Sequence, residues 1–340
     1  MFRAPLDQYL ESGMVQFEID QPDFKAFLTT YRDQRWVLMF PDDIERDDAA
    51  LLNAVHRATG RPDVTVEIIA TGRWELNGLI ADDFSAGRVF LTGDAAHTLP
   101  PTRGGYGANT GIQDVHNLAW KIAAVLDGSS TPALLDTYEA ERRPVAWQRL
   151  QQTFARFDYR AVADGFADGV PIIDAVAMEL GQLYRSTSVI GAGVDLPVAA
   201  RPDEWAGQPG TRAPHLWVDR HGERISTLDL FGHGWMLLAD HDRWNAAAET
   251  AAARTGTEVQ VLLLGRDLST ADGAAVRKAL GLQPGGASLI RPDGFVAWRS
   301  PQLAPDPETA MTDALARTAS SPTATPLNSP RPLTAARQGA

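Results

Sequence analysis

The residues with the clearest chemical potential lie together in one stretch of the chain, from Gly87 to Gly111. The carboxylate of Asp94 comes directly after a short apolar run, 89–92, which is β-branched and aromatic and favours a buried strand. A loop with two prolines and four glycines follows, and it contains Asn109 and Thr110. The carboxylate can accept hydrogen bonds from ligand hydroxyls, and the glycines let a ligand approach the backbone closely.

These residues must be positioned by a strand on one side and a helix on the other. Residues 112–126 carry apolar side chains at helical spacing, so the unit is strand, acidic residue, glycine-rich loop and helix start. A helix start leaves backbone N–H groups without partners and carries partial positive charge, which favours an anionic or electron-rich ligand. A flat ring could lie against the loop stiffened by Pro100 and Pro101, with its polar edge at the amides of 107–110. The same pattern also fits a plain strand-loop-helix connection in an α/β sheet.

A longer set of ordered motifs decides between these interpretations. The motifs are Gly93-Asp94-Ala95-Ala96-His97, Pro100-Pro101, Gly105, Gly107, Asn109, Gly111, Asp114, Asn117-Leu118-Ala119-Trp120-Lys121 and Glu141-Arg142-Arg143-Pro144. Together they resemble the second flavin motif of the FAD-dependent aromatic hydroxylases. These are flavoprotein monooxygenases of the para-hydroxybenzoate hydroxylase and phenol hydroxylase type, including polyketide-tailoring members. The resemblance extends from about residue 2 to residue 298.

The resemblance implies a cofactor, a reaction and a set of site residues. FAD is the implied cofactor and NAD(P)H the co-substrate, and a small-molecule aromatic or polyketide substrate is hydroxylated through a flavin C4a-hydroperoxide. The resemblance implies FAD-binding positions at Gly93, Asp94, Pro101, Gly105, Gly107, Ala108, Asn109 and Thr110, with Asp94 on the ribityl chain. No catalytic acid or base is assigned. A general-acid role for His97 is conceivable, but a hydrogen-bonded structural histidine is favoured, and Glu141 and Arg142 are interpreted as structural ion-pairing residues.

One part of the family pattern is absent from this sequence. The family begins with a βαβ unit whose Gly-x-Gly-x-x-Gly turn seats the pyrophosphate, and no such pattern follows a predicted strand here. We therefore expect the ADP-binding half of the FAD site to be missing, because the chain is a fragment or because that half has been lost or is supplied by a partner. The fragment is favoured, and a homodimer or a partner carrying the missing lobe is the expected assembly. The alternative function is a cofactor-free or inactive binding or scaffold protein derived from such an enzyme.

The predicted fold class is α/β (α+β): a partial FAD-binding domain with a mixed-sheet substrate layer, followed by a thioredoxin-like α/β domain. The expected parts are a substrate-binding sheet layer at 1–80, the second half of the FAD-binding domain plus helices at 81–190, a linker at 191–213, the thioredoxin-like domain at 214–319 and a disordered tail at 320–340. Predicted elements include strands at 15–20, 36–40, 89–92, 235–239 and 259–264, and helices at 48–59, 112–126, 134–157, 162–183 and 244–255. Trp36, Met39 and Trp74 are candidates to line the substrate pocket, and ordinary core packing is the alternative for each.

Composition narrows the remaining possibilities. The 340 residues include 31 Lys or Arg and 43 Asp or Glu, and the net charge of −12 argues against nucleic acid or an anionic membrane as the main partner. Cysteine is absent, so disulfides and thiol chemistry are excluded, and the thioredoxin-like domain is expected to serve structure or assembly. The seven histidines show no helical pairing typical of metal ligands, and no metal is predicted. Without a signal segment or a long apolar run, a soluble cytoplasmic protein is expected.

Overall fold

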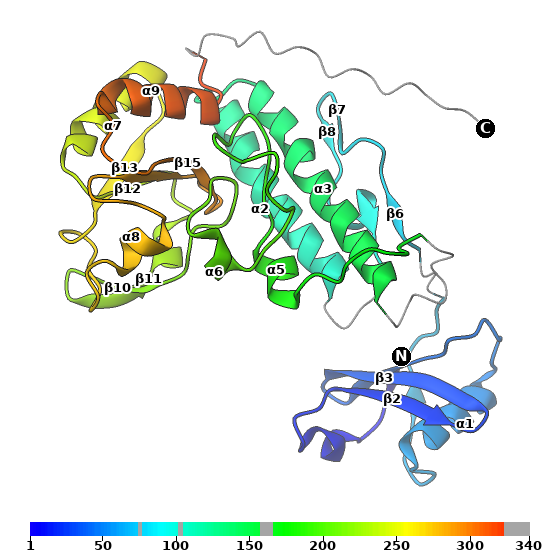
Figure 1. Ribbon diagram of the computed structural model, residues 1–340. Helices are drawn as coiled ribbons and strands as arrows, with labels where there is room; N and C mark the ends of the chain where they lie inside the picture. The colour runs from blue at the N-terminus through cyan, green and yellow to red at the C-terminus, as the bar shows by residue number, and fades with distance from the viewer. Residues whose placement is uncertain (74–76, 101–104, 157–165, 323–340) are drawn as a thin grey trace. The chain divides into compact units, whose positions relative to one another are not determined.

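The computed structural model describes residues 1–73, 77–100, 105–156 and 166–322, and it divides the chain into two compact units, Met1–Glu75 and Leu76–Ala340 (Figure 1). Trp74, Pro101, the first part of the helix predicted at 162–183 and residues 323–340 of the predicted tail lie outside the described residues.

The first unit is an antiparallel sheet of five strands, in the order β2-β3-β4-β1-β5, with one α-helix. Its elements are β1 Phe2–Arg3, β2 Gln16–Gln21, β3 Phe24–Arg32, β4 Arg35–Met39, α1 Asp48–Thr59 and β5 Glu67–Ile68. Helix α1 begins after Asp47, whose carboxylate accepts a hydrogen bond from the amide of Ala50, and ends at Gly60 with φ 65°. The predicted helix at 48–59 is confirmed, whereas β3 was not predicted.

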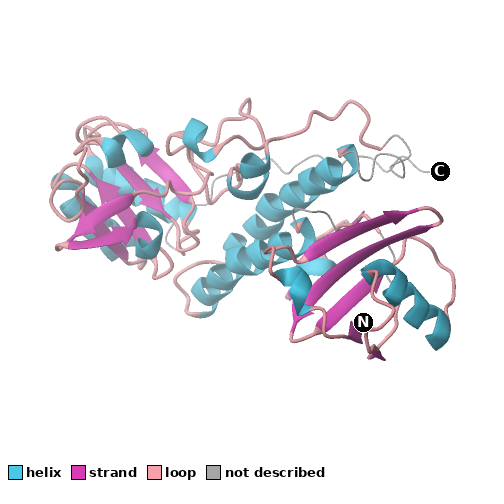
Figure 2. Ribbon diagram, turned by 90° about the horizontal axis from the view of Figure 1, so that it is seen from below, coloured by secondary structure: helices cyan, strands magenta, loops and turns pink. Residues whose placement is uncertain are grey.

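The two faces of this sheet differ because successive side chains of a strand point to opposite sides. One face packs on α1 (Figure 2) around a core of Phe2, Ala4, Leu6, Leu28, Trp36, Val55 and Val64. The other face carries half-buried Phe27, Val37 and Met39, and Phe27 lies opposite Met39 in the register of β3 and β4. Trp36 and Met39 are therefore on opposite faces of the sheet.

The second unit contains two long helices that lie side by side, α2 Tyr106–Leu126 and α3 Ala133–Ala155 (Figure 1). Helix α3 continues through Pro144 without a break. Short strands precede α2: β6 Leu79–Ile80 pairs with β9 His97–Thr98, and β7 Ser85–Ala86 pairs with β8 Val89–Phe90.

The prediction of a buried strand at 89–92 is wrong in length and burial. Strand β8 covers two residues of a two-stranded sheet, and the Val89 side chain is 63% exposed. Of the helical region predicted at 162–183, the described residues contain the short helix α5 Ala175–Leu180, and α6 Pro202–Trp205 follows it.

The rest of the second unit is a four-stranded sheet in the order β13-β12-β14-β15, with β12 and β13 parallel and the other pairs antiparallel. Helices α7 and α9 lie on one side and α8 on the other (Figure 1). The elements are β10 Trp217–Arg220, β11 Glu223–Ser226, β12 Trp235–Ala239, α7 Arg243–Thr255, β13 Val259–Leu263, α8 Ala275–Ala279, β14 Ala287–Ile290, β15 Val296–Ser300 and α9 Pro307–Thr318. This βαβ unit followed by a hairpin and a helix is the predicted thioredoxin-like arrangement, although α9 was not predicted.

Every residue of β12 is buried, because α7 and α9 cover one face of the sheet and α8 the other. Among the helices that the structure describes, none has both the length and the apolar character that crossing a membrane requires.

Candidate functional site

Asp94 lies in a single 3-10 turn, Gly93–Ala95, between β8 and β9. Its side chain is exposed and accepts no hydrogen bond from the described residues. Gly93 has φ 56°, a left-handed conformation that favours glycine. The turn therefore presents a carboxylate that is available to a ligand hydroxyl.

The start of α2 provides hydrogen-bond donors close to this turn. Gly105 precedes the helix with φ 61° and caps it with no side-chain hydrogen bond. The amides of Gly107 and Ala108 are in the first turn of the helix, where no intrahelical acceptor exists for them. The amide of Asn109 is different, since it donates to the carbonyl of Gly105 at 3.2 Å. Of the amides expected to face a ligand, Gly107 and Ala108 keep that capacity.

Thr110 faces α3 rather than the open helix start. Its side chain is fully buried, donates to the carbonyl of Tyr106 at 2.5 Å and accepts from the guanidinium of Arg149 at 2.6 Å. Burial lowers the pKa of Arg149 to about 10, with the charge of Glu179 acting in the opposite direction. The Thr110 hydroxyl therefore fixes the helix start against α3 and is not free to bind a ligand directly.

The turn and the helix are in direct contact. A Cβ atom added to Gly111 would lie 3.0 Å from the Cα atom of Gly93, so only glycine at position 111 fits without displacing backbone. The amide of Gly93 donates to Oδ2 of Asp114 at 3.2 Å. Asp94 is consequently held at a fixed place beside the first turns of α2.

Asp114 is the centre of a buried ionic cluster behind the turn. Oδ2 accepts from Nε2 of His97 at 2.6 Å, and Oδ1 accepts from Nε of Arg142 at 2.7 Å, with all three side chains fully buried. Burial by itself would raise the pKa of Asp114, but the His97 hydrogen bond and the Arg142 charge outweigh it and lower the pKa. Asp114 is therefore ionised near neutral pH.

Three sequence interpretations are confirmed by the buried ion pairs of α2 and α3. His97 is a buried, hydrogen-bonded histidine, and Arg142 is an ion-pairing residue. Glu141 is also an ion-pairing residue, because its carboxylate contacts Lys121 at 2.8 Å and Arg291 at 2.5 Å.

Sequence reasoning missed Arg149, Tyr184 and Arg291. Arg149 lies seven residues after Arg142 and thus on the same face of α3, a spacing that could have indicated it. Tyr184 accepts from Arg142 at 2.7 Å, and nothing in the local sequence marks it. Arg291 lies in the segment Arg291-Pro292-Asp293-Gly294, whose composition indicates a turn and nothing more.

The residues of this site fit the ring and sugar-alcohol half of a flavin. An exposed carboxylate suits the ribityl hydroxyls, and a helix start that no described side chain caps suits the electron-rich edge of the ring. Within the described residues, no group of three or more acidic or histidine side chains could hold a metal ion.

The candidate pocket residues of the first unit have different environments. Trp36 is 0% exposed and lies in the core under α1, the alternative that the sequence left open. Met39 is half-buried on the sheet face opposite α1, together with Phe27 and Val37.

Comparison with known proteins agrees with this geometry. Residues 1–153 match the model of an FAD binding domain, and residues 206–322 match that of the C-terminal region of aromatic-ring hydroxylases. The chain belongs to the FAD-dependent aromatic-ring hydroxylases. The resemblance noted in the sequence is thereby confirmed, and so is FAD as the cofactor of the family.

Individual relatives point to the same family. A 4-methyl-5-nitrocatechol 5-monooxygenase from Burkholderia sp. is 46% identical over 77% of this chain and 49% of its own length. A tetracenomycin B2 monooxygenase-dioxygenase from Streptomyces olivaceus is 42% identical over 87% of this chain and 56% of its own length. The crystal structure of an aklavinone-11 hydroxylase with FAD and aklavinone has a TM-score of 0.85 at 37% identity, over 94% of this chain and 61% of that protein. The chain thus spans about half the length of the two sequence relatives.

Proposed function

We propose that this chain carries part of an FAD-dependent monooxygenase that uses NAD(P)H and O₂ to hydroxylate an aromatic or polyketide substrate. The observation that carries the proposal is the pairing of the exposed carboxylate of Asp94 with the start of α2, which has no side-chain cap among the described residues; Asp114 holds the two together. FAD supplies the electron transfer and the oxygen chemistry, and the protein supplies binding, orientation and electrostatics.

Each residue of the site then has a stated task. Asp94 accepts hydrogen bonds from the ribityl hydroxyls. The amides of Gly107 and Ala108 stabilise negative charge at the pyrimidine edge of the ring. Hydrogen-bond donors that are already in position stabilise developing negative charge effectively. Gly105 lets the ring approach the backbone closely. Asn109 remains an expected contact by family resemblance, as does Pro101, which lies outside the described residues.

The substrate proposal depends on the first unit. The sheet face opposite α1 carries half-buried Phe27, Val37 and Met39, apolar side chains of the kind that line sites for flat rings. The named relatives act on a nitrocatechol, a tetracenomycin and aklavinone, and we therefore propose a phenolic or polycyclic aromatic substrate for this chain. We also retain the proposal that a second copy or a partner supplies the ADP-binding lobe.

Riboflavin, FMN and FAD together test this function. The candidate site contacts the ring and ribityl half, which all three share, so riboflavin binding reports on it without the ADP half. The chain is titrated into each flavin, and quenching of flavin fluorescence and absorbance near ~450 nm are measured. We expect binding, and we expect Asp94→Ala to weaken it by roughly tenfold or more, since a hydrogen bond to a charged group contributes about 1.5–3 kcal/mol.

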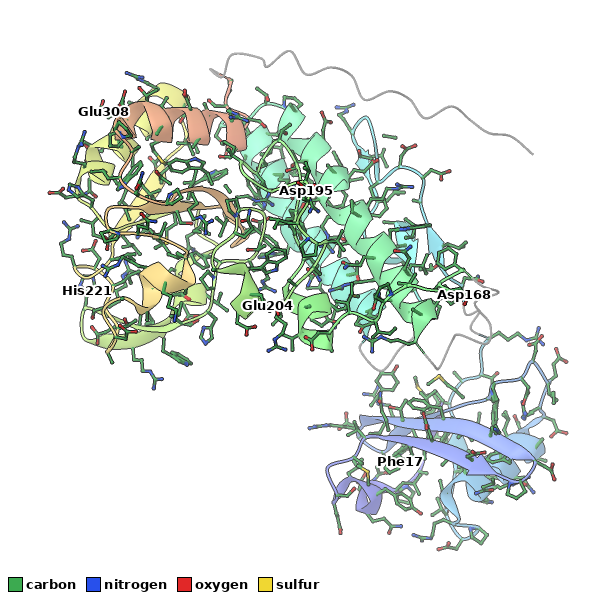
Figure 3. The ribbon with its side chains drawn as sticks, viewed as in Figure 1. Phe17, Asp168, Asp195, Glu204, His221 and Glu308 are labelled. Carbon is green, nitrogen blue, oxygen red and sulfur yellow. The ribbon has the colours of Figure 1, made fainter. Side chains whose placement is uncertain are left out.

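Asp195→Ala is the matched control, because Asp195 is also an exposed aspartate of the second unit (Figure 3). Equal flavin affinity of Asp94→Ala and the unaltered chain would overturn the role of Asp94. A colourless, monodisperse chain that binds none of the three flavins would instead favour the alternative of a cofactor-free binding or scaffold protein.

A further inference from the structure

We propose that the thioredoxin-like part of the chain positions the Gly93–Asp94 turn, acting through Arg291 and Phe295 on the residues that hold the turn. The use of that turn for flavin rests on the proposed function, whereas the coupling itself does not. Arg291 and Phe295 are positioning residues in this proposal, since neither reaches the turn.

Arg291 lies at the end of β14 and is fully buried against α3. Its Nη1 and Nη2 atoms donate to the two carboxylate oxygens of Glu141 at 2.5 and 2.9 Å. Its Nε atom donates to Asp293 at 3.0 Å, and the guanidinium lies 5.3 Å from the ring centroid of Trp120 on α2. One side chain of the thioredoxin-like part therefore contacts both long helices.

Glu141 of α3 also binds side chains of α2. Besides Arg291, it accepts from Lys121 at 2.8 Å and from Asn117 at 2.7 Å, and from the hydroxyl of Ser186 at 2.6 Å. Lys121 and Asn117 are one turn apart on α2, so the carboxylate fixes the rotation of that helix about its own axis. The Gly93 turn is fastened to the same helix by Asp114.

A second bridge runs from Phe295 at the start of the next strand. Its ring stacks on that of Tyr184 with centroids 4.1 Å apart and an interplanar angle of 11°. The hydroxyl of Tyr184 accepts from Arg142 at 2.7 Å, and Arg142 donates to Asp114 at 2.7 Å. Asp114 then accepts from the amide of Gly93 at 3.2 Å, which completes a continuous path from the thioredoxin-like sheet to the turn.

The two bridges are better suited to fixing the position of α3 than to increasing the stability of the fold. The attraction within a buried ion pair offsets the cost of removing both charges from water only when the geometry is good. A protein with apolar residues of similar volume in place of the pair is often just as stable. A bidentate guanidinium–carboxylate pair does fix distance and angle, because the fork matches the two oxygens. The Tyr184–Phe295 stack likewise has a preferred geometry. The two bridges end on neighbouring residues of α3, Glu141 and Arg142, and both have a preferred geometry. Together they fix α3 relative to the thioredoxin-like sheet.

Amide hydrogen exchange of the purified full chain tests the coupling without any flavin. The test variants are Arg291→Lys, which keeps the charge but loses the fork, and Phe295→Leu, which removes the stack without removing a charge. The control is Arg266→Lys. Arg266 pairs with Asp267 in the same part of the chain, but the arginine side chain is 63% exposed. Exchange is followed at the amide of Gly93, and at Leu237 in β12 as a measure of general opening.

We expect each test variant to speed exchange at Gly93 by roughly tenfold relative to Leu237, within the 5- to 150-fold range usual for coupling between sites. The NMR signal of the His97 Nε2 proton, which reports its bond to Asp114, should shift in the same variants. Arg266→Lys should change neither quantity.

Unchanged exchange at Gly93, or a rise equal to that at Leu237, would overturn the proposal, because the second result means only a loss of stability. If Arg291→Lys fails to fold, the exchange rate at Gly93 in Phe295→Leu is the test of the proposal. Since no flavin is present, these outcomes are separate from those of the riboflavin titration.

Discussion

Asp114 accepts hydrogen bonds from the backbone amide of Gly93 and from the side chains of His97 and Arg142. These three residues belong to three different elements. Glu141, on the next helix, has the same character, with four donor residues around one carboxylate. Neither residue touches the proposed ligand position. Both act by fixing residues that do, and both must be ionised to accept all of these bonds.

Acid should therefore destabilise the second unit. The pKa of Asp114 is lowered, by the His97 hydrogen bond and the Arg142 charge against burial, and the pKa of Glu141 is lowered mainly by Arg291 and Lys121 against burial. A carboxyl group whose folded pKa is depressed contributes stability above its unfolded pKa, and that contribution is lost as the pH falls through the folded value. We expect the melting temperature to fall below about pH 4, near the unfolded pKa of carboxylates.

Thermal denaturation at several pH values measures this effect. Asp114→Asn should flatten the pH dependence and lower stability at neutral pH by about 3–5 kcal/mol, the usual cost of breaking a buried pair. Asp195→Asn is the exposed control and should leave the profile unchanged. A chain whose melting temperature does not respond between neutral and acidic pH would contradict the prediction.

At the scale of elements, the β8–β9 turn and α2 touch through two glycines. Gly111→Ala places a Cβ 3.0 Å from the Cα of Gly93, a backbone atom that must move. We expect a loss of about 1–3 kcal/mol in the free energy of unfolding, typical of overpacking, measured by urea denaturation. Gly107→Ala is the matched control on the same helix, since its Cβ would meet only ordinary contacts at 3.9 Å. Equal stability of the two variants would show that the turn has room to move.

The sheet of the first unit allows a second comparison. Trp36 is in the core and Met39 is on the sheet face opposite α1. Trp36→Ala should cost about 3–5 kcal/mol and unfold this unit, whereas Met39→Gln should leave its urea midpoint nearly unchanged and weaken binding of an aromatic substrate. If Met39→Gln affects neither stability nor substrate binding, the face opposite α1 is not the substrate surface.

The sequence predicted those elements whose own residues include helix caps or a continuous apolar run. The cap at Asp47 and the glycine at position 60 mark both ends of α1, and the uniformly apolar run of β12 marks a strand covered on both faces. Strand β3 has Lys25, Thr29 and Thr30 among its apolar residues, and α9 begins in a proline-rich stretch, so neither stands out locally. In the site, the motif residues could be predicted, but Arg291 could not, because its partner Glu141 is 150 residues away in sequence.

At the scale of the whole chain, α2 presents apolar side chains that the described residues leave uncovered. Ile112 is 67% exposed, Val115 53% and Leu126 82%. They recur at spacings that place them on one side of the helix. Exposed apolar patches favour association with another surface.

The 340-residue chain by itself should consequently self-associate at high concentration. Replacing Ile112 and Val115 together by glutamine should reduce the association, measured by sedimentation velocity over a range of concentrations. Ile44→Gln, at a residue of the first unit that is 66% exposed, is the control for lost surface hydrophobicity. A strictly monomeric unaltered chain, or an equal effect of Ile44→Gln, would contradict this assignment.

The buried position of the Arg291–Glu141 pair has one more consequence, for the ionic strength that the protein can tolerate. Dissolved ions weaken charge pairs at the surface, such as Arg3–Glu67 with side chains 49% and 64% exposed, but they screen pairs sealed from water far less. Concentrated salt should thus loosen the periphery of the first unit while the thioredoxin-like sheet stays fastened to α3.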